Sequence, residues 1–383
     1  MTSPANIGNI RNIAVLAHVD AGRTTTTERI LALADRSGVA GEDHGITLTA
    51  AATTCGWRGH SVTIIDVPSS LVHGTDAARA IRVADGAVAL IDAESGVESQ
   101  LEALWRLADD RALARIVFVN KMDRAGADFG AAVEAVRSKL KALPLVLALP
   151  LGQGSDFIGI IDLVRERALT WKAMPFGAAF AEEPIPADRL VEAQQARAAL
   201  VAVVAPKQTG TDGLVAAIRA AVAAGTVVPV LPGSAFRNKG MQPLLDAIVD
   251  YLPSPDQVGA VEVQDPATGS FSSRAANDDA PLTVFAFRSG LDPVAGPLLF
   301  ARIFSGVLAQ GAEIANATTG HPSRVARVLR FEASERVELA QATAGDIVAL
   351  DGLGEARPGD TLTAPGQLAL VEPTTEQIRS RSA

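Results

Sequence analysis

The sequence predicts an α/β domain with a doubly wound, mostly parallel sheet, followed by a small antiparallel β-barrel. In the first 142 residues, short apolar runs alternate with helical patterns, which is typical of the strands and helices of a doubly wound sheet. After Pro281 the pattern changes, and short β-type runs are separated by Gly and Pro turns, as in a small barrel. An open sheet of the first kind binds its ligands at the carboxyl ends of its strands.

The first domain is expected over residues 1–255, with an insertion at about 143–225. Apolar runs predict buried strands, and the periodic segments between them predict helices. The strands are expected at 12–17, 61–67, 86–91, 115–119 and 226–233, and the helices at 24–35, 75–84, 98–110, 128–142 and 241–252. The insertion interrupts this alternation. It is rich in Ala, and we expect it to be mostly helical.

The second half of the chain begins with a predicted linker over residues 256–280, which are rich in Asp, Gln, Gly, Ser and Ala. The barrel is expected over 281–365, with strands at 282–288, 298–304, 324–330 and 346–350. The remaining residues, 366–383, form a polar tail that we expect to fray.

Composition narrows the class of protein. The 383 residues are 48% hydrophobic and 20% charged, which is enough apolar material for a full core. A net charge of -9 argues against broad nucleic-acid binding, and no DNA partner is expected. Cys55 is the only cysteine, so the chain has no internal disulfide and suits a reducing compartment. With no signal pattern and no long apolar run, we expect a cytoplasmic protein without a membrane span.

A phosphate-binding loop is predicted where the strand at 12–17 runs into a glycine turn and a helix start. The pattern G-x-x-x-x-G-K-[ST] is present with Ala17 in place of its first Gly and Arg23 in place of its Lys. Backbone N–H groups of this turn are expected to bind phosphate, and the Thr24 hydroxyl to bind Mg²⁺. Arg23 keeps the charge of Lys in a bulkier, forked group, so the exchange is not conservative. The expected contacts are His18, Val19, Asp20, Ala21, Gly22, Arg23, Thr24 and Thr25.

A second candidate is Asp66, which follows an apolar run and begins the sequence Asp-Val-Pro-Ser. Walker-type sites hold Mg²⁺ with an acidic residue in this place, usually through water. GTPases have the pattern D-x-x-G here, and the glycine amide contacts the γ-phosphate. Ser69 keeps an amide but lacks the conformational freedom of Gly. An ordinary turn at an Asp before Pro is the alternative interpretation.

A third motif predicts that the base is guanine. Asp123, in Asn-Lys-Met-Asp, can accept hydrogen bonds from both N1–H and the exocyclic amine of guanine, a donor pair that adenine lacks. Asn120 is expected to brace the loop, and the stem of Lys121 to lie on the base. The sequence Ser-Ala-Phe after the next strand is expected to point amides at the guanine O6. The residues expected around the base are Asn120, Lys121, Asp123, Ser234, Ala235 and Phe236.

Together these motifs resemble the translational GTPases, most closely elongation factor G. The resemblance continues in Gly-Ile-Thr-Leu-Thr at 45–49, Asp-Tyr-Leu-Pro-Ser-Pro at 250–255 and Phe-Ser-Gly-Val-Leu at 304–308. It implies a P-loop GTPase domain followed by the family's second domain, with GTP or GDP and Mg²⁺ as ligands and the ribosome as a partner of the barrel. It also makes Thr47 the Mg²⁺ ligand that senses the γ-phosphate. Catalytic positions would then be Arg23, Thr47 and Asp66.

Departures from that family concern the γ-phosphate. The family's Asp-x-Pro-Gly-His ends in a water-positioning His, whereas this chain has Ser69 and Ser70. Loss of such assistance costs roughly 10²–10⁴-fold in rate. His73 is close enough in sequence to substitute in part, although a surface position is the simpler interpretation. The first switch segment is also short, with His44 in place of Arg, and we expect the family's three C-terminal domains to be missing.

Three hypotheses follow for the function. The first is a guanine-nucleotide-binding protein in which GTP hydrolysis is weak or lost. The second is an active GTPase that works in translation on the ribosome, supported by the retained Thr24, Thr47 and Asp66. The third is an interaction module without nucleotide, in which Arg23 folds across the pocket and pairs with Asp20 or Asp66. The sequence does not fix an oligomeric state.

Overall fold

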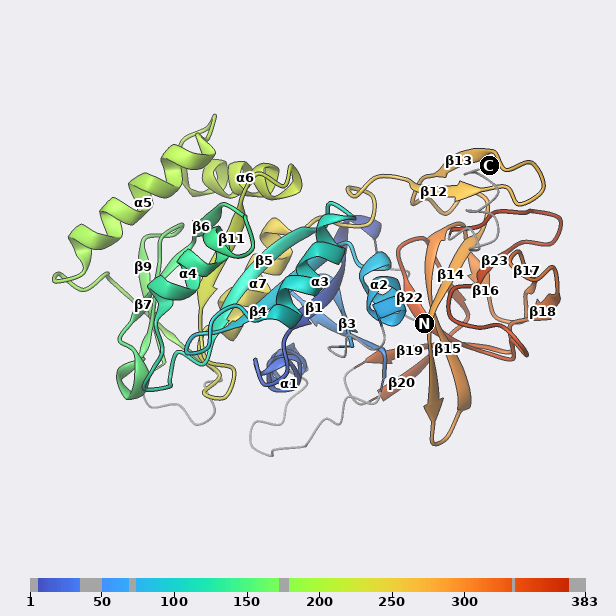
Figure 1. Ribbon diagram of the computed structural model, residues 1–383, viewed down its shortest axis with the longest axis horizontal. Coiled ribbons are helices and arrows are strands. Elements are labelled where there is room, and N and C mark those ends of the chain that lie inside the picture. The colour runs from blue at the N-terminus through green and yellow to red at the C-terminus, as the bar shows by residue number, and fades with distance from the viewer. Residues whose placement is uncertain (1–5, 35–49, 69–73, 172–178, 333–334, 372–383) are drawn as a thin grey trace.

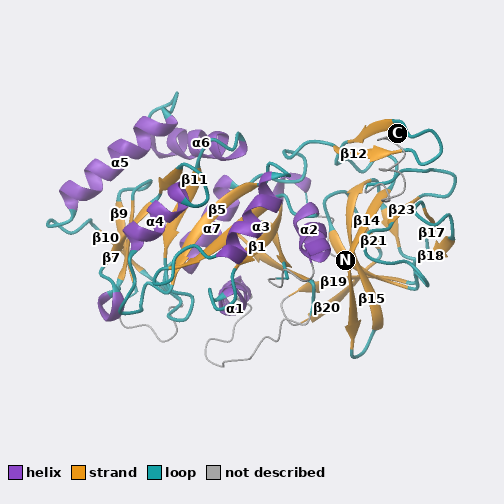
Figure 2. Ribbon diagram, in the orientation of Figure 1, coloured by secondary structure: helices purple, strands orange, loops and turns teal. Residues whose placement is uncertain are grey.

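The computed structural model describes residues 6–34, 50–68, 74–171, 179–332 and 335–371, and it confirms the predicted fold class (Figure 1). An α/β domain lies beside an antiparallel β domain, and helices alternate with strands only in the first (Figure 2). The two domains share one hydrogen-bonded sheet of 15 strands. The link between them is a parallel pairing of β19 (Arg327–Glu332) with β2 (Ala52–Trp57) through Glu332 and Thr54.

The sheet of the α/β domain places β1 (Ile10–Ala17) between two parallel neighbours, β3 (His60–Asp66) and β4 (Gly86–Asp92). It continues in parallel through β5 (Ala114–Asn120) and β11 (Val228–Pro232), while β2 runs antiparallel to β3. Every residue of β1 and β4 is buried, as expected of strands covered on both faces. The carboxyl ends of the parallel strands therefore meet at one edge of the sheet.

In the described part of the chain, helices cover both faces of this sheet. The pair α1 (Arg23–Ala34) and α7 (Met241–Tyr251) packs on one face, and the other face carries α2 (Gly74–Arg82), α3 (Ser99–Asp109) and α4 (Phe129–Ser138). The core beneath α2 continues into the β domain, where it includes Phe285, Phe287 and Phe300. In the described part of the chain, no helix is long and apolar enough to cross a membrane.

The insertion is helical only in its second half, which differs from the expectation. Its first strand joins the edge of the main sheet, its next four form an antiparallel sheet, and two helices follow. These elements are β6 (Pro144–Val146), β7 (Ala148–Leu151), β8 (Gly159–Asp162), β9 (Arg167–Thr170), β10 (Ala181–Glu183), α5 (Leu190–Val204) and α6 (Gly210–Ala223). Pro144 and Pro150 disfavour a helix in the first half. At Gly159 a Cβ would lie 2.1 Å from the carbonyl oxygen of Leu169, so glycine permits the close pairing of β8 and β9.

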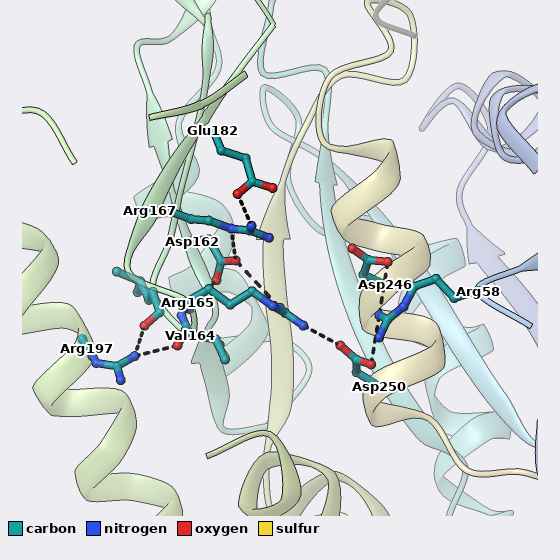
Figure 3. Close-up of polar contacts among 10 residues, drawn as sticks. Arg58, Asp162, Val164, Arg165, Arg167, Glu182, Arg197, Asp246 and Asp250 are labelled. Carbon is teal, nitrogen blue, oxygen red and sulfur yellow. Dashed lines mark hydrogen bonds and ion pairs between the residues drawn. The ribbon is translucent and has the colours of Figure 1, made fainter. Parts of the chain in front are cut away.

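A network of charged side chains ties the insertion to the sheet (Figure 3). Asp250, on α7, accepts hydrogen bonds from Arg58 at 3.1 Å and from Arg165 of the insertion at 3.0 Å. Arg58 also reaches Asp246 at 3.3 Å, and Asp162 lies 3.8 Å from Arg165. Each oxygen of the buried Asp250 carboxylate therefore has an arginine partner. These pairs offset the free-energy cost of burying the carboxylate.

The predicted linker and residues 366–371 of the predicted tail are more ordered than expected. Residues 256–280 contain a hairpin of β12 (Val261–Gln264) and β13 (Phe271–Arg274), whose strand residues include β-formers separated by a turn. Leu370 in the predicted tail exchanges two backbone hydrogen bonds with Gln264, at 2.8 and 2.9 Å. Leu370 and Val371 are buried, so apolar burial holds this segment in place. Residues 372–383 lie outside the described part of the chain.

The β domain has a core of its own, separate from the core that it shares with the α/β domain. Its strands pair with antiparallel neighbours within the domain. They are β14 (Thr283–Asp292), β15 (Gly296–Ser305), β16 (Leu308–Ala309), β17 (Glu313–Asn316), β18 (Pro322–Arg324), β19, β20 (Glu335–Leu339), β21 (Gln341–Ala342), β22 (Ile347–Asp351) and β23 (Thr361–Thr363).

A buried ion pair fastens the two domains together. Arg302 of β15 lies 2.6 Å from Asp85, which precedes β4, and also donates to the carbonyl oxygen of Val83. Asn12 of β1 donates both to Asp85 and to the carbonyl oxygen of Gly345, each at 2.8 Å. Burial raises the pKa of Asp85 in spite of the opposing effect of Arg302. With a shared core and this pair, the domains are packed as one unit.

Candidate nucleotide site

A cavity of about 730 Å³ lies at the carboxyl ends of β1 and β5, and its size suits a nucleotide. It brings together the two regions that the sequence assigned to phosphate and to base. Its lining residues are His18, Val19, Asp20, Gly22, Arg23, Thr24, Thr25, Asn120, Lys121, Asp123, Arg124, Phe236 and Arg237. Three predicted contacts, Ala21, Ser234 and Ala235, do not line the cavity. Arg124 and Arg237 also line the cavity, although no motif predicts them, and they directly follow the predicted contacts Asp123 and Phe236.

The phosphate loop has the backbone that its sequence predicts. Asp20 and Gly22 have positive φ angles of 70° and 90°, and α1 begins immediately afterwards at Arg23. A Cβ at Gly22 would lie 2.4 Å from the Asn120 amide nitrogen, so a side chain there would displace Asn120. The N–H of Thr26 donates to the carbonyl oxygen of Gly22 at 2.8 Å, which closes the first helical turn. This arrangement leaves a helix N-terminus facing the cavity, which favours anions.

Asn120 connects the phosphate loop to the loop after β11. Its amide nitrogen donates to the carbonyl oxygen of Ala21, and its oxygen accepts from the N–H of Ala235, both at 2.9 Å. All three residues are buried. Ala21 and Ala235 therefore lie behind the cavity wall and shape it through Asn120.

The carboxylate of Asp123, which is predicted to recognise the base, is oriented by a hydrogen bond to one of its oxygens. The hydroxyl of Ser234 donates to Asp123 Oδ1 at 2.6 Å, while Arg237 Nε lies 3.8 Å from Oδ2. The amide of Ser234 donates to the carbonyl oxygen of Lys239, and that of Ala235 is used by Asn120. In this structure the amides of Ser234 and Ala235 are hydrogen-bonded within the protein, and the contact of the Ser-Ala-Phe amides with the guanine O6 stays a prediction. The Ser234 hydroxyl orients Asp123.

Lys121 and Phe236 form walls of the base region. Lys121 has a φ of 64°, and its ammonium group lies 2.7 Å from Asp92, which leaves its stem along the cavity. Burial would raise the pKa of Asp92, but the hydrogen bonds from Lys121 and from the N–H of Glu94 lower it overall. Phe236 is 69% exposed, and the guanidinium of Arg237 lies 5.6 Å from its ring centre. An exposed aromatic ring at this point offers a surface for a planar base.

His18 contributes a buried imidazole to the phosphate side. Its Nδ1 lies 3.4 Å from Glu98, and its Nε2 has no hydrogen-bond partner among the residues that the structure describes. The next residue, Val19, is fixed by Gln100, which accepts its N–H at 3.0 Å. A buried ring nitrogen without a partner at a cavity wall can bond to a ligand.

Asp66 lies between two arginines at the end of β3. Arg23 donates to the carbonyl oxygen of Val67, and its Nε lies 3.5 Å from Asp66 Oδ1. From the β domain, Arg288 Nη1 donates to the carbonyl oxygen of Asp66 at 3.0 Å and to its Oδ2 at 3.2 Å. Each carboxylate oxygen of Asp66 thus faces a guanidinium group.

The residues described do not fit a Mg²⁺ site in this arrangement. Thr24 lies at the start of α1 in the cavity wall, but Asp66 is engaged by two cations, and Thr47 lies outside the described residues. Mg²⁺ requires free oxygen ligands in a near-octahedral shell at about 2.0–2.1 Å. Over the described ranges, no group of three acidic, His or Cys side chains could hold a metal. The altered residues Ser69 and Ser70, with His44 and His73, also lie outside the described part.

Comparisons with known proteins agree with the geometry. The elongation factor Tu GTP-binding domain family matches residues 8–254, and the elongation factor Tu domain 2 family matches residues 296–363. A protein of Thermus thermophilus with a known crystal structure has a TM-score of 0.77 and 24% identity. That match covers 97% of this chain but 56% of the other, so the chain spans little more than half of that relative's length.

The range matched by the GTP-binding domain family is more than half of the chain, and it includes the phosphate loop, Asp66 and the residues around Asp123. The Thermus relative, at its low identity, independently supports the fold alone. The chain therefore belongs to the elongation factor Tu GTP-binding domain family, that of the translational GTPases.

Proposed function

We propose that this protein binds GDP and GTP and hydrolyses GTP weakly or not at all. One observation carries the first part: Asn120 joins the phosphate loop to the loop that orients Asp123, around one cavity. Asp123 presents a carboxylate edge that matches the two donors of guanine. The phosphate end supplies a helix N-terminus, His18 and Arg23.

The proposed weakness in hydrolysis rests on groups around the γ-phosphate. Arg23 points to Asp66 and Val67, and the sequence has Ser70 where the family has a water-positioning His. Without a group that positions water, the rate falls by roughly 10²–10⁴-fold. The hypothesis of an active GTPase requires another group to restore this assistance.

Family membership supports a further part of the proposal, that the protein acts in translation and contacts the ribosome through its β domain. A cytoplasmic location follows from that role. Sedimentation with ribosomes in the presence of GTP or GDP tests it, and a chain that stays in the supernatant with both nucleotides contradicts it.

The second candidate is an interaction module that binds no nucleotide. That hypothesis predicts a pairing of Arg23 with Asp66, which is observed. The cavity nevertheless keeps a volume of about 730 Å³ with Arg23 in its wall. We therefore favour nucleotide binding.

Calorimetric titration with GDP, GTP and ATP separates these candidates. Binding of GDP and GTP at micromolar or tighter affinity, without binding of ATP, is the expected result. If no nucleotide binds, the interaction module is the better description.

The variant Asp123→Asn tests whether Asp123 recognises the base. Its amide can donate to the C2 carbonyl of xanthine but repels the exocyclic amine of guanine. The variant should lose GDP and gain xanthosine diphosphate, with an unchanged melting temperature. Equal GDP affinity in both proteins would contradict the role given to Asp123.

A further inference from the structure

Arg288 of the β domain contacts Asp66, which in turn contacts Arg23 in the wall of the nucleotide cavity. It belongs to β14, yet both of its hydrogen bonds to Asp66 cross into the α/β domain, over 222 residues of sequence. Its side chain is about two-thirds buried, with 33% exposed. It therefore belongs to the domain interface and is not a freely moving surface group.

A β-bulge fixes the direction of Arg288. The pairing of β14 with β15 shifts register between Ala286 and Arg288, which leaves Phe287 as the extra residue. Phe287 is buried in the core that both domains share, 6.4 Å from the ring of Phe300. Bulges of this kind redirect the following side chain and are held by their packing.

We infer that nucleotide binding in this protein does not require Mg²⁺, because Arg23 supplies the positive charge for the phosphates and Arg288 takes over Asp66. This inference rests on the proposed guanine-nucleotide binding and names the counter-charge at its phosphate end. Arg23 is the binding residue, and Arg288 is a positioning residue that acts through Asp66.

The electrostatics favour an exchange of partners. Arg23 lines the cavity and lies 3.5 Å from Asp66, a long and partly exposed contact. When phosphate enters, Arg23 can leave Asp66 and donate to the phosphate with its forked guanidinium. Asp66 keeps a partner, since Arg288 remains on its other oxygen. Arg288, which stays beside the carboxylate, also repels a divalent cation at that point.

The first experiment is calorimetric titration of the full chain with GDP, in excess Mg²⁺ and again in EDTA. Affinities within about threefold of each other are expected, since the counter-charge belongs to the protein. Binding that tightens by about tenfold or more in Mg²⁺ overturns the inference and leaves the proposed function intact. Absence of binding in both buffers overturns both.

The variant Arg288→Gln tests the positioning role. With Asp66 left to Arg23 alone, GDP affinity in EDTA should fall by about tenfold, and Mg²⁺ should now restore part of it. Arg288→Lys should recover most of the affinity in EDTA, because it returns the charge. Arg327→Gln is the matched control: Arg327 pairs with Asp351 at 2.7 Å within the β domain and is similarly exposed. A loss of GDP affinity in this control as large as in Arg288→Gln would mean a general structural effect and overturn the inference.

If the Arg288→Gln variant does not fold, the variant Asp66→Asn tests the same inference. Without the carboxylate, Arg23 is free for phosphate, and GDP should bind about threefold more tightly in EDTA. A residue that acts by holding Mg²⁺ would give the opposite result, weaker binding that is confined to the Mg²⁺ buffer. That outcome overturns the inference.

Discussion

The side-chain amide of Asn120 donates a hydrogen bond to the carbonyl oxygen of Ala21 at 2.9 Å, so the base-reading loop and the phosphate loop share one buried residue. The same side chain accepts the N–H of Ala235 from a third loop. A buried residue that satisfies a donor and an acceptor on two separate loops fixes their distance. The spacing between the phosphate and base regions of the cavity is thus set by the buried side chain of Asn120.

The variant Asn120→Ala is expected to lose both stability and nucleotide affinity. It leaves the carbonyl oxygen of Ala21 and the N–H of Ala235 without their partner, which costs about 1–3 kcal/mol in the free energy of unfolding. Denaturant unfolding and GDP titration measure the two effects. Asn316→Ala is the matched control, because Asn316 is equally buried but bonds to Asp360 in the β domain. It should reduce stability alone, and a loss of GDP affinity there would contradict the argument.

Asp250 is expected to anchor the insertion. Asp250→Ala leaves Arg58 and Arg165 without their shared carboxylate, and a cost of about 1–3 kcal/mol is expected because the arginines remain partly exposed. Asp246→Ala removes a more exposed carboxylate that pairs with Arg58 and accepts the indole N–H of Trp57 at 2.9 Å, and it should cost less than Asp250→Ala. Equal losses in urea unfolding would show that burial of Asp250 has no special importance.

Cys55 provides a prediction about pH. Burial raises the pKa of its thiol to about 12 from an ordinary value of 9.0, so the folded state favours the protonated form. Its contribution to the free energy of unfolding is therefore constant below pH 9.0 and falls as pH rises from there toward 12. The fall should approach about 1.4 kcal/mol per pH unit, and a Cys55→Ala variant should lack this component.

Thiol labelling checks the same property directly, because the chain has one cysteine. At pH 8, reaction of the folded protein with a thiol reagent should be at least about 10³-fold slower than that of the unfolded chain. Rapid labelling without unfolding would mean that Cys55 is accessible, in conflict with its position on β2.

Local motifs explain which features the sequence could predict. The phosphate loop and the motif at Asn120 combine a strand, a turn and a helix start within a few residues, so their placement follows from the chain itself. The secondary structure of the insertion is harder to predict, because the Ala and Leu residues of β7 and β9 also suit a helix. Tertiary pairing decides between helix and strand there. Arg288 gives no local signal, because its partner Asp66 lies 222 residues away and a bulge sets its direction.

The last prediction concerns the rate of GTP hydrolysis. It distinguishes a protein that has lost this activity from one in which another residue performs it. If hydrolysis is weak because of Arg23, Ser69 and Ser70, restoring the family residues in Arg23→Lys/Ser69→Gly/Ser70→His should raise single-turnover GTP hydrolysis by roughly 10²–10⁴-fold. Lys is a compact charge that releases the Asp66 oxygen held by Arg23, while Arg288 stays on the other oxygen. Gly restores the freedom of the turn, and His can position water. The variant Arg23→Lys alone is the control and should change affinity with little effect on rate. If the unaltered protein already hydrolyses GTP at the rate of the restored variant, another residue performs the chemistry and the active-GTPase hypothesis replaces ours.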